Sequence, residues 1–327
     1  MKILVTGATG FIGSVLVREL AAKGNTVRAL ALAGENTSLL DRAGIEVRRG
    51  DLNVRGSLRG ICDGIDVIFH CAARVTDWGT KRQFYRAILD ATQNLLDEAR
   101  GQACRFVYVS SIAALGMGRH LRGAKESDAP QWSGVPYNDA KADTERLVRE
   151  FHDRGDISCT VVRPANVTGP GSVWVRDILD HMSGFLGLPL IDGGRYSSSF
   201  VYVDSLVDGM IRAGTREKAA GKTYHFRDDW KVSWEKYLKD LGAFIGKRPR
   251  GNYPFRLAWG MGMIMERICN PLHLRPSVTR LAVGVMGRDN DVDTSLAKAD
   301  LEWNTTTPYE EALEKTGQWI RSLYRVP

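Results

Sequence analysis

Residues 2–13 read Lys-Ile-Leu-Val-Thr-Gly-Ala-Thr-Gly-Phe-Ile-Gly, a short apolar run that passes directly into Gly7, Gly10 and Gly13. The apolar run predicts a buried parallel strand, and residues 11–22 carry the apolar spacing of a helix. Glycines between a strand and a helix let the backbone turn and approach a pyrophosphate closely, and the helix N-terminus attracts anions. A plain tight turn is the alternative interpretation, but the order of strand, turn and helix favours a site for a dinucleotide cofactor.

Short β-rich runs alternate with helical stretches as far as about residue 165. This alternation predicts an α/β fold of the Rossmann type, with a doubly wound parallel sheet. We therefore expect a dinucleotide-binding domain at 1–165 and a smaller, mixed substrate-binding portion at 166–327, interleaved with the sheet rather than joined to it by a linker. The predicted strands are 2–6, 26–32, 46–48, 67–70, 105–110 and 159–163, and later helices are expected near 205–218, 233–246, 255–268 and 308–323.

Composition and charge limit the possible partners. The chain has 327 residues, of which 43% are hydrophobic, and this suits a large buried core. A formal net charge of +7 is compatible with a nucleic-acid partner, an anionic membrane surface or the steering of phosphate-bearing cofactors. Because basic residues are dispersed among acidic ones, we expect no nucleic-acid partner. The one tight cluster, Lys247, Arg248 and Arg250, is interpreted as a solvated loop.

The N-terminus and the cysteines indicate a cytoplasmic protein. Met1 leads directly into the first predicted strand without a cationic and apolar leader, so we expect no export. The five cysteines are scattered without CxxC spacing, which predicts neither a disulfide framework nor a metal site.

An apolar segment at 253–287 is interrupted by charged residues and Pro271 well short of the ~20 apolar residues that a membrane span needs. The favoured interpretation is a helix that packs its apolar stripe on the core, with methionines as adaptable filler. The alternative is an adaptable lip for a bulky apolar substrate, or a peripheral membrane contact.

A tyrosine and a lysine, Tyr137 and Lys141, lie four residues apart in a stretch with helical spacing. At that spacing they share one helix face, and a neighbouring ammonium favours the phenolate, so the pair can exchange a proton with a substrate. Such pairs are also common on helix surfaces, so the motif needs a partner. Ser111 follows the predicted strand at 105–110, where it can donate a hydrogen bond to a developing alkoxide, although serines also cap strand ends.

In these motifs the chain resembles the extended short-chain dehydrogenase/reductase family, also described as the NAD-dependent epimerase/dehydratase superfamily. The further markers are Asp51-Leu52, His-Cys-Ala-Ala at 70–73 and Arg-Pro-Ala-Asn-Val-Thr-Gly-Pro at 163–170, so the resemblance runs nearly end to end. It implies an NAD(P)-dependent enzyme in which Tyr137 moves the proton, Lys141 tunes it and holds the nicotinamide ribose, and Ser111 stabilises the oxyanion. The cofactor contacts that the resemblance implies are Gly7, Thr9, Gly10, Phe11, Ile12, Gly13, Asp51, Leu52, Ala72, Ala73, Tyr137, Lys141, Pro164, Asn166 and Val167.

The chain departs from the family pattern at two places. Ile88 stands where the family usually has Asn, so the water relay behind the lysine is expected to differ. The second strand ends in Ala31 and Leu32, where an NAD-preferring relative would carry an acid at 31 and many NADP-preferring ones an Arg at 32. No carboxylate is present at these positions to repel a 2′-phosphate, and Arg28 and residues 36–38 are expected within reach of it. The sequence therefore favours NADP, with NAD as the alternative.

The substrate half indicates which branch of the family the chain resembles. Sugar-nucleotide epimerases and dehydratases usually carry an Arg that grips the diphosphate two residues before Phe-Val-Tyr-Val, and here Ser198 stands at that place, with Arg195 nearby. The run looks instead like the 3β-hydroxysteroid dehydrogenase and sterol-4-carboxylate dehydrogenase branch, or like the related dihydroflavonol-reductase-like enzymes. We therefore expect an oxidoreductase that interconverts a secondary alcohol and a ketone on an apolar, steroid- or lipid-like small molecule.

Two other functions stay open. A sugar-nucleotide epimerase or dehydratase would use the same three residues with no net turnover of cofactor. A non-catalytic nucleotide-sensing protein would have no need to keep Ser111, Tyr137 and Lys141 together. The resemblance also implies a homodimer formed through the helix that carries Tyr137 and its neighbour.

Overall fold

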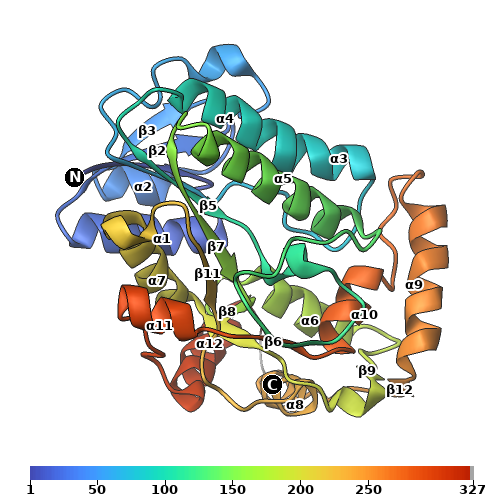
Figure 1. Ribbon diagram of the computed structural model, residues 1–327. Coiled ribbons are helices and arrows are strands. Elements are labelled where there is room, and N and C mark those ends of the chain that lie inside the picture. The colour runs from blue at the N-terminus through green and yellow to red at the C-terminus, as the bar shows by residue number, and fades with distance from the viewer. Residues whose placement is uncertain (325–327) are drawn as a thin grey trace.

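A seven-stranded parallel sheet lies at the centre of the molecule, seen in a computed structural model that describes residues 1–324 (Figure 1). The strand order is β11-β7-β5-β4-β1-β2-β3, so the chain runs outward from β1 in both directions. The strands are β1 (Lys2–Thr6), β2 (Thr26–Ala31), β3 (Glu46–Arg49), β4 (Val67–His70), β5 (Arg105–Val109), β7 (Ser158–Pro164) and β11 (Thr223–Phe226).

Helices cover both faces of the sheet, and this is why its central strands β1, β4 and β5 are buried almost along their whole length rather than in alternation. In β1, Ile3 and Val5 point into a core shared with α1 (Phe11–Ala22) and α7 (Val203–Thr215). Leu4 points into a second core on the opposite face, beneath α4 (Ala91–Ala99) and α5 (Pro136–Asp153). The predicted α/β, Rossmann-type sheet is therefore confirmed.

A smaller layer lies beyond the carboxyl ends of the strands (Figure 1). Its own core forms between α6 (Val173–Ser183), α8 (Trp234–Ala243) and α12 (Tyr309–Leu323). Its other helices are α9 (Phe255–Cys269) and α10 (Arg280–Met286), and α11 (Ser295–Leu301) lies beside α7. The remaining elements are α2 (Ser38–Arg42), α3 (Lys81–Tyr85), β6 (Leu121–Ala124), β8 (Asn166–Thr168), β9 (Leu190–Ile191), β10 (Phe200–Tyr202), β12 (Asn252–Tyr253) and β13 (Asn290–Val292).

Two features of residues 166–324 differ from what the sequence indicated. β11 joins the central sheet beside β7 as a strand that sequence reasoning missed. The apolar segment at 253–287 forms two helices, and α9 buries only a narrow stripe of four residues, while five of its large apolar side chains are exposed: Leu257, Met261, Met263, Ile264 and Ile268. The segment does contain a helix that packs a stripe on the core, but the interpretation is wrong for the five exposed apolar side chains of α9.

Candidate active site

The glycine loop between β1 and α1 is shaped so that side chains would not fit. Gly7 has φ +67°, and a Cβ atom added there would lie 2.8 Å from the backbone nitrogen of Ala72. A Cβ atom on Gly13 would lie 2.0 Å from the Gly7 carbonyl oxygen. Gly10 is the N-cap of α1 and has no side chain to occupy the first backbone N–H groups of the helix. The loop thus presents bare backbone donors at a helix N-terminus, a cradle that suits a pyrophosphate.

A cavity of about 670 Å³ opens at the carboxyl ends of β1, β2 and β4. The glycine loop forms one wall, and Asp51 and Leu52, which follow β3, form another. The predicted cofactor residues that line this cavity are Gly7, Thr9, Gly10, Phe11, Ile12, Gly13, Asp51, Leu52, Ala72 and Ala73. The cavity volume and its lining, which includes the glycine loop, Asp51 and Trp174, suit a dinucleotide.

A second cavity, of about 140 Å³, adjoins the first, and Phe11, Ile12 and Trp174 line both. The other predicted site residues, Ser111, Tyr137, Lys141, Pro164, Asn166 and Val167, line this smaller cavity. Most of its remaining wall is aromatic or aliphatic: Met117, Val175, Ile178, Phe200, Trp234, Leu281 and Val285. The two adjoining cavities therefore bring together the predicted catalytic residues and the cofactor contacts that the family resemblance implies.

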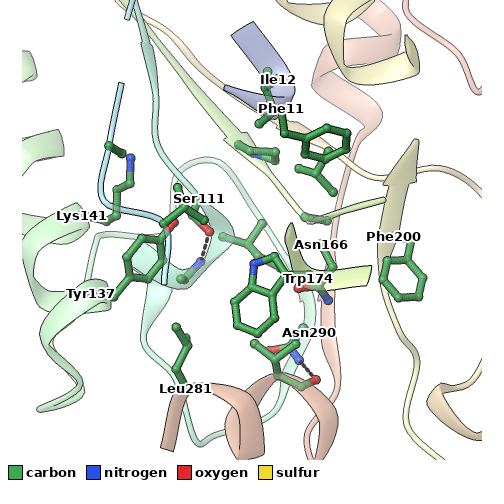
Figure 2. A pocket seen from close by; sticks show the side chains of 18 of the residues that line it. Phe11, Ile12, Ser111, Tyr137, Lys141, Asn166, Trp174, Phe200, Leu281 and Asn290 are labelled. Atoms are coloured by element: carbon green, nitrogen blue, oxygen red, sulfur yellow. Dashed lines mark hydrogen bonds between the residues drawn. The ribbon is translucent and has the colours of Figure 1, made fainter. Parts of the chain in front are cut away.

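Three elements position the polar side chains of the smaller cavity. Tyr137 and Lys141 lie on α5, which starts with Pro136 in its first turn. Ser111 follows β5 and is the N-cap of the short 3₁₀ helix Ile112–Leu115, where its Oγ accepts a hydrogen bond from the Ala113 backbone N–H at 3.1 Å. Figure 2 shows Ser111, Tyr137 and Lys141 together on one side of the cavity, with Trp174 and Phe200 across from them.

Burial sets the protonation of Tyr137 and Lys141. It raises the pKa of the Tyr137 phenol to about 12, and a hydrogen bond with Ser111 acts in the lowering direction. It lowers the pKa of the Lys141 ammonium to about 8, against the opposing effect of the Glu145 carboxylate. The sequence predicted that the ammonium would favour the phenolate, but the pKa of Tyr137 is raised, and burial is the largest cause. Tyr137 is therefore a protonated phenol at neutral pH, the form that can donate a proton to an alkoxide.

The Lys141 ammonium is fixed by contacts with β5. Lys141 is almost fully buried, and its Nζ donates a hydrogen bond to the Val109 carbonyl oxygen at 2.7 Å. The same ammonium lies 4.9 Å from the ring centroid of Tyr108. These contacts fix the side chain at the end of β5, beside the cavity that it lines.

A buried hydrogen-bond chain that sequence reasoning missed orders the strand ends beneath the site. Thr92 Oγ1 donates to the Ile88 carbonyl oxygen at 2.6 Å and so accepts from His70 Nε2 at 2.9 Å. His70 Nδ1 then accepts from Thr6 Oγ1 at 2.7 Å. Burial lowers the pKa of His70 to about 3, so the imidazole is neutral. Ile88 itself lies in a π-helical turn, Arg86–Asp90, and packs in a cluster with Phe84 and Tyr137.

A buried ion pair fixes α5 against β7. Arg163 Nη2 donates to Glu145 Oε2 at 2.7 Å, and both side chains are fully buried. Ser110 Oγ donates to the other carboxylate oxygen at 2.5 Å. The sequence included Arg163 in the 163–170 motif, but nothing in the pattern indicated its partner, which lies eighteen residues earlier on the helix that carries Tyr137 and Lys141.

The end of β2 differs from what the sequence indicated. Arg28 is not within reach of a cofactor, because it is buried, lies 3.1 Å from Glu46 and donates to the Ile61 carbonyl oxygen at 2.7 Å. Residues 36–38 do not line the larger cavity either, whereas Leu32 and Glu35 do. The Glu35 carboxylate accepts a hydrogen bond from the Leu32 backbone N–H at 2.9 Å, which places an acid at the strand end after all.

Comparison with known proteins links this site to a family of enzymes. Residues 3–226 match the model of the NAD dependent epimerase/dehydratase family. The chain is 30% identical over 324 residues to the 4-hydroxy-2-methyl-3-oxo-4-farnesyl-3,4-dihydroquinoline-1-oxide ketoreductase of Stigmatella aurantiaca, covering 97% of this chain and 96% of that protein. It is 23% identical to the human decarboxylating sterol-4-alpha-carboxylate 3-dehydrogenase, covering 98% and 89% of the two chains.

A solved structure with a similar fold is that of the UDP-glucose 4-epimerase of Thermotoga maritima with UDP-glucose. The TM-score is 0.77 at 22% identity, and the match covers 99% of both chains. At this identity the likeness shows the fold alone.

Proposed function

Since the chain belongs to the NAD-dependent epimerase/dehydratase family, a family of enzymes, we propose that it is an oxidoreductase that interconverts a secondary alcohol and a ketone on an apolar, steroid- or lipid-like substrate. The observation that carries this proposal is the smaller cavity, in which Ser111, Tyr137 and Lys141 face a wall of aromatic and aliphatic side chains. Burial of apolar substrate surface against such a wall favours binding. A sugar diphosphate would find no charged partners there and would lose its hydration.

In this proposal the adenosine and pyrophosphate of the cofactor would occupy the larger cavity, and its nicotinamide would extend into the adjoining smaller cavity and there supply or accept the hydride. In ketone reduction, Tyr137 donates its phenolic proton to the oxygen that becomes an alkoxide, so that hydride and proton together convert the carbonyl to a secondary alcohol. Ser111 donates a hydrogen bond to the same oxygen. Lys141 holds the ribose and keeps a positive charge near Tyr137. The position of all three on one side of the cavity supports these roles.

The substrate preference is tested with a series of methyl ketones of increasing alkyl chain length. Burial of one methylene group contributes ~0.8 kcal/mol, so kcat/KM is expected to rise about threefold to fourfold per methylene until the cavity is filled. Val285→Thr, which puts a hydroxyl in the cavity wall at equal volume, should reduce the gain per methylene, whereas the exposed Val54→Thr should not. A kcat/KM that does not change with chain length contradicts an apolar site.

We propose that Glu35 decides between NAD and NADP. The sequence favoured NADP partly because Arg28 was expected to contact the 2′-phosphate. Arg28 instead contacts Glu46 and the Ile61 carbonyl oxygen, so it does not favour NADP. Arg49 contacts the same loop through the carbonyl oxygens of Leu32 and Glu35, but it does not line the larger cavity, whereas Glu35 does. A carboxylate near the adenosine ribose accepts a hydrogen bond from a 2′-hydroxyl and repels a 2′-phosphate, so we propose a preference for NAD.

Glu35→Gln is therefore expected to raise the ratio of kcat/KM with NADPH to kcat/KM with NADH by about tenfold, equivalent to ~1.4 kcal/mol of relieved repulsion. The measurement is steady-state kinetics with both cofactors and one ketone. Asp41→Asn, an acid outside the cavity on the same part of the chain, serves as the control and should leave the ratio unchanged. A wild-type enzyme that prefers NADPH, with a ratio insensitive to Glu35→Gln, contradicts this assignment.

Sugar-nucleotide chemistry is the alternative, because the family includes epimerases and dehydratases. Two observations count against it in this chain. Ser198 is buried, and its Oγ donates to the Val232 carbonyl oxygen at 2.8 Å. Arg195 is exposed, contacts the Tyr196 hydroxyl at 3.1 Å and does not line the smaller cavity. Neither is placed to grip a diphosphate.

The same proposal extends to the organisation of the chain. We assign most cofactor contacts to residues 1–165 and most substrate contacts to residues 166–327, of which 325–327 lie outside the described part of the chain, since Phe200, Trp234 and Val285 line only the smaller cavity. We also propose a cytoplasmic homodimer that pairs through α4 and α5, as the family resemblance implies. Over residues 1–324, no helix combines the length and the apolar character that crossing a membrane requires.

A further inference from the structure

α9 carries a second apolar stripe whose side chains remain exposed in residues 1–324. Its buried stripe is Phe255, Ala258, Gly262 and Glu266, which pack toward α10 and the core. The exposed stripe recurs at intervals of four, three and four residues, and this spacing places its members on one face of the helix. These residues are Leu257, Met261, Ile264 and Ile268, each between 36% and 59% exposed.

More exposed apolar side chains lie at both ends of α9. Leu272 and Leu274 follow it directly and are 63% and 57% exposed. Phe185 and Leu186, in the turn after α6, are 97% and 82% exposed. That turn lies beside the segment that leads into α9, because the Arg250 backbone N–H donates to the Leu188 carbonyl oxygen. We call these residues, together with the exposed stripe, the α9 surface; Figure 1 shows α9 at the outer edge of the molecule.

From residue 247 to residue 275, the stretch that contains α9, the exposed charged side chains are all basic. The exposed basic side chains between residues 247 and 267 have no ion-pair partner within residues 1–324; they are Lys247, Arg248, Arg250, Arg256 and Arg267. The one acid between residues 247 and 275 is Glu266, which is buried and lies 2.7 Å from Arg280. The α9 surface therefore combines exposed apolar groups with uncompensated positive charge.

We propose that the α9 surface docks on an anionic phospholipid bilayer. A helix that lies in the membrane interface shows this combination, with apolar side chains inserted below the headgroups and arginines among the phosphates. A second copy of the chain would bring the same five positive charges against one another, and this disfavours self-association through this face. Phe185 and Leu186, at the tip of a turn, are exposed as an inserting wedge would be.

The position of α9 relates the bilayer to the smaller cavity. α9 packs on α10, and Leu281 and Val285 of α10 line that cavity. A bilayer against the outer face of α9 therefore lies one helix layer from the cavity wall. An apolar substrate partitioned into the membrane would be concentrated at the enzyme, which agrees with the proposed substrate class but does not depend on it.

The test is co-sedimentation of the full chain with vesicles of phosphatidylcholine alone and of phosphatidylcholine mixed with phosphatidylglycerol. We expect binding to the mixed vesicles that falls steeply with added salt, because the charge contribution is screened. Leu257→Ser combined with Ile264→Ser should lower the binding constant roughly tenfold or more, because two apolar side chains are lost from the interface. Arg256→Gln combined with Arg267→Gln should weaken binding to the mixed vesicles alone.

Leu39→Ser is the matched control, since Leu39 lies on α2 and is 74% exposed. It should bind vesicles as the wild type does. The proposal is overturned if the wild type stays in the supernatant with both vesicle types, or if the Leu257 and Ile264 substitutions leave binding unchanged. It is also overturned if those substitutions dissociate an oligomer in lipid-free sedimentation velocity, which would assign the surface to a second copy. Vesicle binding needs no cofactor or turnover, so its failure is separate from failure of the proposed activity.

Discussion

Tyr137→Phe is expected to lower kcat for ketone reduction by about 10²- to 10⁴-fold while the affinity for the cofactor changes little. The substitution removes one hydroxyl from a ring that keeps its packing beside Phe84. Without that hydroxyl, no phenolic proton is available for the alkoxide, and Ser111 alone can only stabilise it by a hydrogen bond. Single-turnover kinetics with bound reduced cofactor measures the chemical step, and fluorescence titration measures cofactor binding.

The control for this substitution is Tyr253→Phe, which removes a hydroxyl from an exposed tyrosine outside both cavities. It should leave kcat unchanged. A Tyr137→Phe enzyme with more than half of the wild-type kcat would show that another group donates the proton.

Arg163→Met is expected to lower the free energy of unfolding by about 3–5 kcal/mol. Arg163 and Glu145 are fully buried and joined by hydrogen bonds of 2.7 and 3.0 Å, so removal of the guanidinium leaves a carboxylate in the core with Ser110 as its remaining hydrogen-bond donor. Urea denaturation followed by circular dichroism measures the change.

Two further variants identify the cause. Arg154→Met breaks an exposed pair with Asp156 and should cost less than ~1 kcal/mol. Arg163→Met combined with Glu145→Leu removes both charges and should recover a large part of the loss, because the cost comes from the unpaired carboxylate. A single Arg163→Met variant within ~1 kcal/mol of the wild type would contradict a structural role for the pair.

The sequence predicted the parts of the site that follow from short-range patterns. The glycine loop needs only the order of strand, glycines and helix, and the i, i+4 spacing of Tyr137 and Lys141 needs only a helix. The strand bounds came out within about two residues because apolar runs of parallel strands are marked by polar residues at both ends. The ends of parallel strands meet at one edge of the sheet, which is why Ser111 lies with Tyr137.

The sequence did not reveal features that depend on which distant residues meet. Arg28 was expected to face the cofactor, but the direction of its side chain is set by Glu46 on the neighbouring strand and by the Ile61 carbonyl oxygen. Glu35 lies at the end of β2 because of the conformation of a loop. A loop has no periodic hydrophobic pattern from which that conformation could be predicted. The apolar residues of α9 were assigned to the core because hydrophobicity alone does not tell a buried face from an exposed one.

We expect Ser111, Tyr137 and Lys141 at the smaller cavity to carry out net reduction or oxidation of an apolar substrate. The most direct measurement follows the absorbance of reduced nicotinamide while the purified protein is given NADH or NADPH, first with long-chain methyl ketones and then with UDP-glucose, whose products are analysed. We expect stoichiometric loss of reduced cofactor with the ketones, formation of the secondary alcohol and no change in UDP-glucose. An unchanged cofactor together with an epimerised or dehydrated sugar nucleotide would contradict the account.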